Sequence, residues 1–195
     1  MRTRRDTRRA TDTPSTWKRS ALRWLPTFFG FPLGGLVAEH VSGPVDHLSA
    51  ALIGGLITGL ILGAVQSWGL GTSGPPARQW IAATAAGFTV GLGVGAAAVG
   101  YGTSMGDLVV QGAICGLAIG TTQAVVLRPR IGRLAYAWVP VLGALWALGW
   151  AITTAIGVDV ESQYTVFGSS GALFVTAATV ALPLVLANGS AKSAS

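Results

Sequence analysis

The ionisable side chains of this 195-residue chain gather most densely in one short stretch, AEHVSGPVDH, at residues 38–47. Four of its residues are chemically active, namely Glu39, His40, Asp46 and His47. Imidazole nitrogens and carboxylate oxygens bind divalent cations, so a bend that brings the four together is a candidate metal site. However, the spacing matches no metal-binding motif, and Ser42 and Pro44 equally suit a turn that starts a helix. We keep the four as candidates and assign no metal, cofactor or catalytic residue.

A second stretch, FGSSGALF at residues 167–174, resembles the serine motif of rhomboid intramembrane proteases, a Gly-x-Ser-Gly at a helix start. The resemblance covers these few residues only, and it implies a nucleophilic Ser170. A serine nucleophile needs a base within hydrogen-bond reach, and that family places a histidine on a later helix. No histidine follows Ser170 in this chain. We therefore expect Ser169, Ser170 and Gly171 to be small packing residues.

Two glutamines occupy matching places in otherwise apolar stretches. Gln66 lies in GLILGAVQSWGL, and Gln123 lies in the later stretch GLAIGTTQAVVL. Each follows a glycine by three positions, so on a helix the amide and the glycine share one face. We expect both amides to hydrogen-bond a neighbouring helix as polar packing residues. A polar ring that lines a pore is the alternative.

The composition around these residues is that of a membrane protein. Hydrophobic residues make up 51% of the chain and charged residues 10%, against about 25% charged in soluble domains. A bilayer core needs about 20 mainly apolar residues per helix. Six stretches meet this length, near 24–41, 46–70, 78–101, 106–127, 134–157 and 164–187. The sequence predicts an all-α, polytopic bundle of six transmembrane helices, since its continuous apolar runs exclude barrel strands.

The charges predict which way the bundle faces. The 13 lysines and arginines fall in the N-terminal arm, the second and fourth connections and the C-terminal tail. The other connections hold or border only acidic residues, namely Glu39, Asp46, Asp107, Asp159 and Glu161. Basic loops stay on the cytoplasmic side, so we expect a plasma (inner) membrane protein with both termini in the cytoplasm.

The N-terminal arm, residues 1–23, carries the whole formal net charge of +6. It lacks apolar periodicity, so we expect it to be disordered and drawn to anionic lipid. Nucleic-acid binding is not expected, because no aromatic residues or folded module accompany the basic ones. Residues 188–195 form the expected cytoplasmic tail.

An internal repeat links the apolar stretches. GLITGLILGAVQSWGL (55–70) and GAICGLAIGTTQAVVL (112–127) match at seven positions, and GFPLG (30–34) matches GFTVG (87–91) at the same offset. A weaker third copy contains GALWALG (143–149) and ends at Leu186, with Leu182 in place of the glutamine. The sequence thus predicts three tandem helical hairpins, about 24–70, 78–127 and 134–187. Because each enters from the same side, the repeats are parallel.

Small and aromatic residues suggest how the helices pack. Glycines recur every four residues at Gly55, Gly59 and Gly63, and similarly on the next two stretches. Such stripes let helix backbones approach closely, and we favour packing within the chain over a dimerisation face. Most tryptophans lie near cytoplasmic span ends, where an interfacial belt is expected. Trp146 and Trp150 lie deeper, which favours core packing.

The middle of the expected spans contains no Lys, Arg, Asp or Glu, which argues against a proton relay or an enzyme. We expect a non-catalytic small membrane subunit or helix-packing protein, whose partners are the lipid bilayer and another membrane protein or a second copy. One alternative is a small transporter or channel for an apolar or neutral solute, using the bundle axis or an outer vestibule near His40 and His47. A membrane enzyme acting on lipid is the other.

Overall fold

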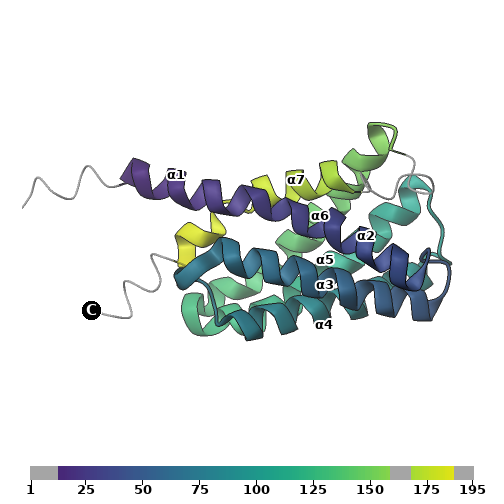
Figure 1. The fold of residues 1–195 in the computed structure, drawn as a ribbon, viewed down its shortest axis with the longest axis horizontal. Coiled ribbons are helices and arrows are strands. Elements are labelled where there is room, and N and C mark those ends of the chain that lie inside the picture. The colour runs from purple at the N-terminus through teal and green to yellow at the C-terminus, as the bar shows by residue number, and fades with distance from the viewer. Residues whose placement is uncertain (1–12, 159–167, 187–195) are drawn as a thin grey trace, which may run out of the picture.

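The computed structural model describes residues 13–158 and 168–186, which form helices joined by short turns and contain no strand. The chain begins with α1 (Thr13–Trp24), the 3-10 turn η1 (Leu25–Phe29) and α2 (Gly30–Ser42). The remaining elements are α3 (Leu48–Leu70), η2 (Gly71–Ser73), α4 (Ala77–Ala98), α5 (Met105–Ile131), η3 (Gly132–Ala137), α6 (Trp138–Ala155) and α7 (Ser169–Ala178). They form one elongated bundle (Figure 1). The predicted all-α fold is confirmed.

Four helical stretches among the described residues are long and apolar enough to cross a membrane. They are Leu48–Ser73, Ala77–Ala98, Met105–Ala155 and Ser169–Leu186. The first expected span, 24–41, is not one of them, because its helix is divided between η1 and α2. Pro26 lies at the start of η1, where a residue without a backbone N–H interrupts the α-helical ladder. The four apolar stretches indicate a membrane-embedded protein.

The longest stretch, Met105–Ala155, reverses direction between α5 and α6. Gly132 ends α5 with a φ of 59°, a conformation that glycine adopts without steric cost. Beyond it α6 runs back along α5, so that Gly112 faces the backbone of Trp146 and Gly120 faces that of Val139. The expected spans 106–127 and 134–157 therefore correspond to two antiparallel helices within this stretch.

The same antiparallel packing recurs between successive helices around the bundle. At each contact a glycine lies against the next helix: Gly34 at Thr58, Gly59 at Ala85, Gly91 at Cys115, Gly116 at Leu142 and Gly149 at Gly171. Helix α7 in turn packs against η1 and α2, which closes the bundle into a ring. Because a glycine has no side chain, the two backbones approach closely, and dispersion contacts then hold the helices together.

The bundle separates its charges lengthwise. The described lysines and arginines lie at one end, the basic end, on α1, the start of α4 and the end of α5 with η3: Lys18, Arg19, Arg23, Arg78, Arg128, Arg130 and Arg133. The described carboxylates lie at the other, the acidic end: Glu39, Asp46 and Asp107. The predicted Asp159, Glu161 and Lys192 fall outside the described residues.

Many large apolar side chains face outward, while glycines and alanines occupy the contacts between helices. On α3, Leu56 is 45% and Leu60 43% exposed, whereas Ala51 is fully buried and Gly55 and Gly59 contact α4. A soluble protein rarely exposes wide apolar surfaces. Lipid tails solvate such a surface, so this arrangement agrees with a membrane environment.

Helix α1 begins within the arm that the sequence predicts to be disordered. Residues 13–23 are helical, and residues 1–12 lie outside the described part of the chain. Ala21 and Trp24 are buried against the bundle at 8% and 2% exposure. This contact explains the difference, because packing of one helix face stabilises a short helix that its local sequence alone does not.

Candidate functional site

The four candidate metal ligands lie at the acidic end, on the last turn of α2 and in the loop before α3. His40 Nδ1 hydrogen-bonds the carbonyl oxygen of Leu36 at 2.8 Å, and His47 Nδ1 contacts the carboxylate of Asp46. Within the described residues, no three His, Cys, Asp or Glu side chains are close enough to hold a metal ion. The fold therefore pairs His47 with Asp46 and does not bring the four side chains together as one metal-binding group.

Glu39 and Asp46 line a chamber of about 370 Å³ at the acidic end, whereas neither histidine does. Its walls come from successive helices of the ring, with Ala38 on α2, Thr58 on α3, Leu92 on α4 and Gln111 and Cys115 on α5. Because the helices surround it, the chamber lies along the bundle axis.

Four aromatic side chains form the floor of the chamber: Phe31, Phe88, Trp146 and Trp150. The centroid of the Phe31 ring lies 6.0 Å from that of Phe88 and 5.4 Å from that of Trp146. Phe88 and Trp146 complete a triangle at 5.3 Å, with their rings nearly perpendicular. We call these four residues the aromatic floor. They come from α2, α4 and α6, so three alternate helices of the ring meet on the axis.

Beyond the aromatic floor lies a smaller cavity of about 50 Å³. Apart from residues of the floor, its lining includes three tryptophans and their hydrogen-bond partners. Trp80 Nε1 donates to Gln66 Oε1 at 3.2 Å, and Trp138 Nε1 donates to Gln123 Oε1 at 2.8 Å. Gln123 Nε2 also donates to Thr84 Oγ1 at 2.9 Å. Both glutamines thus contact neighbouring helices and also face the axis.

The third tryptophan, Trp24, also hydrogen-bonds a neighbouring element of the ring, but its partner is not a glutamine. Its Nε1 lies 3.2 Å from Thr179 Oγ1 and 3.0 Å from the carbonyl oxygen of Thr176, on the stretch that begins with α7. Leu182, which aligns with the glutamines in sequence, instead packs in the hydrophobic cluster at the basic end. A threonine on the preceding turn, Thr179, accepts the indole proton in its place.

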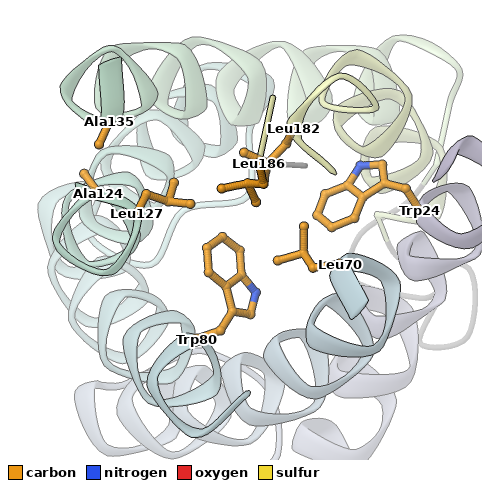
Figure 2. Packing of buried hydrophobic residues seen from close by; sticks show 8 residues of the cluster. All are labelled: Trp24, Leu70, Trp80, Ala124, Leu127, Ala135, Leu182 and Leu186. Carbon is orange, nitrogen blue, oxygen red and sulfur yellow. The ribbon is translucent and has the colours of Figure 1, made fainter. Parts of the chain in front are cut away.

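The prediction that most tryptophans form an interfacial belt is wrong for two of them. Trp24 and Trp80 are only 2% and 1% exposed, and both point toward the centre of the ring (Figure 2). An indole N–H needs a hydrogen-bond partner when buried, and each finds one inside the bundle. Trp68 fits the belt better, since it is 57% exposed and lies 5.6 Å from the Arg23 guanidinium.

Leucines fill the axis at the basic end. Leu70, Leu127 and Leu186, which we call the leucine cap, are at most 5% exposed and pack in one cluster (Figure 2). The chamber is therefore separated from the basic end first by the aromatic floor and then by the indole-lined cavity and the leucine cap. Within residues 13–158 and 168–186, the axis holds a chamber at the acidic end and is closed by side chains toward the basic end.

No known protein family matches this chain, and neither a curated protein nor a solved structure is detectably similar to it. The chemistry of the site therefore rests on the geometry of its own residues.

The candidate nucleophile Ser170 has no base beside it among the described residues. Its Oγ lies 3.2 Å from Thr153 Oγ1, which also accepts a hydrogen bond from the backbone N–H of Gly171. Both histidines lie on or after the last turn of α2 and contact Leu36 and Asp46 instead. The hydroxyls bridge α6 and α7, an arrangement suited to packing.

Sequence reasoning missed the aromatic residues on the axis, although their spacing carries a signal. The interval from Phe31 to Phe88 equals the interval that separates Gln66 from Gln123, and Trp146 follows Phe88 at nearly the same interval. The three tryptophans that line the cavity beyond the aromatic floor, Trp24, Trp80 and Trp138, are spaced in nearly the same way. A search for aromatic residues at this offset would have found both layers.

Proposed function

We propose that this chain is a multi-pass plasma-membrane protein with six spans, built as three tandem hairpins around an axial chamber. The layers on the axis support the repeat, because each draws one residue from each proposed hairpin. The leucine cap, the three indoles and the three mutually contacting aromatic rings all follow this rule. A pseudo-threefold axis along the membrane normal then places the chamber where the hairpins meet.

The same proposal places the basic end in the cytoplasm and the chamber mouth outside the cell. Lysine and arginine are retained on the cytoplasmic side of membrane proteins. The described basic and acidic residues lie at opposite ends of the bundle, which supports one consistent orientation.

We propose that the function is to bind a small solute from outside the cell and to move it across the membrane. The chamber carries this proposal, because sites for small molecules are usually concave, mostly apolar and of about 300–1,000 Å³. An aromatic floor and a few polar wall residues meet that description. Since the aromatic floor and the leucine cap close the axis on either side of the small cavity, transport requires their side chains to move, as in a transporter and not an open channel.

The packing-subunit alternative has less support. It followed from the lack of ionisable residues in the expected spans, and the glycine stripes supply no partner surface because they lie against helices of the same chain. A membrane partner or a second copy would have to use the outward apolar side chains, which lipid equally solvates. The proposed role is non-catalytic, because the polar residues of the chamber include no nucleophile with a base beside it among those described.

Access to Cys115 tests the proposed function directly. It is the single cysteine of the chain and it lines the chamber. We expect a small membrane-impermeant thiol reagent to modify Cys115 in intact cells, and Cys115→Ser to abolish the modification. Because Cys115 is only 3% exposed, the measurement is repeated with Leu92→Cys in the Cys115→Ser background, at a partly exposed position of the chamber wall. If both thiols react only after denaturation, the chamber is closed to the outside and the proposed function fails.

A further inference from the structure

The charged side chains that line the chamber are acidic. Glu39 and Asp46 line it, and among the described residues neither carboxylate forms an ion pair with a lysine or arginine. The only described partner of Asp46 in such a pair is His47, while the described basic side chains lie at the opposite end. A hollow with low-dielectric walls concentrates the field of such charges and attracts ions of the opposite sign.

The aromatic floor adds a second feature that favours a cation. The faces of aromatic rings carry partial negative charge and attract ammonium groups within about 6 Å, and tryptophan does so most strongly. Phe31, Phe88, Trp146 and Trp150 all border the chamber. A ligand at this depth leaves water, so it needs an apolar body as well as a charge.

Gln111 provides an independent polar contact point. Its side chain lines the chamber and is only 9% exposed. It forms no hydrogen bond with another described residue, and its amide is open to the chamber. An unpaired amide in the wall of a chamber suits a ligand that carries a hydroxyl or carbonyl group.

We propose that the chamber binds a small organic cation, an ammonium compound with an apolar body. The cationic group lies between the Glu39 and Asp46 carboxylates and the aromatic floor, and Gln111 hydrogen-bonds a polar substituent. This inference rests on the proposed function, since it names the class of solute that the chamber accepts. It also changes the expectation from the sequence, which favoured an apolar or neutral solute.

A pair of thiol reagents of opposite charge tests the inference at Cys115. Trimethylammonioethyl methanethiosulfonate carries a quaternary ammonium group, and sulfonatoethyl methanethiosulfonate carries an anion of similar size. Each rate is measured with the full-length protein in intact cells or nanodiscs and divided by the rate with free mercaptoethanol. We expect the cationic reagent to modify Cys115 at least about tenfold faster after this correction. Benzyltrimethylammonium should protect the thiol, and its uncharged carbon analogue, neopentylbenzene, should not.

Charge-neutralising variants test whether Glu39 and Asp46 cause the preference for the cationic reagent. Glu39→Gln with Asp46→Asn should remove most of the preference for the cationic reagent. Asp107→Asn is the matched control, because this acidic-end residue does not line the chamber and its capping contacts with Ser104 can be kept by an amide oxygen. The control should keep the preference.

The outcomes separate the two proposals. Equal corrected rates for both reagents, without protection by benzyltrimethylammonium, would overturn the cation proposal and leave an accessible chamber. A preference that survives in the double variant would also overturn it, because the carboxylates would not be its source. If neither reagent modifies Cys115 or the more exposed Leu92→Cys in the folded protein, the proposed function itself fails.

Discussion

Trp138 Nε1 donates a 2.8 Å hydrogen bond to Gln123 Oε1, and Gln123 in turn donates to Thr84 on a third element of the ring. One buried amide thus joins α4, α5 and the start of α6. Trp80 and Gln66 repeat the first contact one helix pair earlier. These bonds hold adjacent helices in register around the cavity.

The Gln123–Trp138 bond should be measurable by a double-mutant cycle. We expect Gln123→Leu and Trp138→Phe each to lower the free energy of unfolding. Their coupling energy should be about 0.6 kcal/mol or more, the average for hydrogen bonds between membrane helices. Reversible unfolding of the purified protein in mixed micelles supplies the four values. The pair Gln123→Leu and Trp68→Phe is the control and should show no coupling. A Gln123–Trp138 coupling of zero would contradict the bond.

Glycines at helix contacts should not tolerate a methyl group. A Cβ added at Gly59 would lie 2.7 Å from Ala85 Cα, and one at Gly91 would lie 2.8 Å from Cys115 Cα. Both neighbours are backbone atoms, so the helices must separate. Gly59→Ala and Gly91→Ala should each destabilise the protein by about 1–3 kcal/mol, the usual effect of overpacking.

Gly106 provides the matched control for these substitutions. It lies in the first turn of α5, and an added Cβ would meet its nearest side-chain atom, Ser104 Oγ, at 3.9 Å. Gly106→Ala should be neutral or slightly stabilising, since alanine favours helix more than glycine. Equal thermal stability of all three variants would show that the close helix contacts are not required.

The sequence predicted the helical class and the contacts of the glutamines because both depend on local pattern. Apolar length and the position of Gln66 beside Gly63 are visible without a fold. A vestibule near His40 and His47 was only an alternative, and the aromatic floor was not predicted, since it arises only where α2, α4 and α6 meet. Phe31 and Trp146 lie far apart in the chain and read as ordinary apolar residues until the ring closes.

The metal hypothesis shows that residues close in sequence need not share a site in the fold. Glu39 and His40 are adjacent in sequence, yet on a helix adjacent side chains point about 100° apart. The turn of α2 directs Glu39 to the chamber and leaves His40 on its own helix at Leu36. Their proximity in sequence suggested one shared metal site, but the helix geometry places Glu39 and His40 in different surroundings.

Topology should be testable with single cysteines in a Cys115→Ser background. His47→Cys is in the loop between α2 and α3 at the acidic end, and Thr72→Cys is in η2 at the basic end. Both native side chains are exposed. We expect an impermeant maleimide to label the first in intact cells and the second only after permeabilisation. The reverse pattern would place the chamber mouth in the cytoplasm.

Thr27 and Thr84 occupy equivalent places in the first two proposed hairpins and should respond in opposite ways to the same substitution. Thr84 Oγ1 accepts from Gln123 and donates to the carbonyl oxygen of Trp80. Thr27 Oγ1 is buried and has no hydrogen-bond partner among the described residues. Valine has the shape of threonine without the hydroxyl, so it isolates the polar contribution.

We expect Thr27→Val to raise the free energy of unfolding by about 1 kcal/mol, because it removes an unpaired buried polar group. Thr84→Val should lower it by about 1–2 kcal/mol, because it leaves the Gln123 amide without its acceptor. Thermal unfolding of both variants in the same detergent gives the comparison. A loss of stability for Thr27→Val equal to that for Thr84→Val would mean that Thr27 is hydrogen-bonded in the membrane. In that case Gln66, the counterpart of Gln123 in the first proposed hairpin, is the partner to examine.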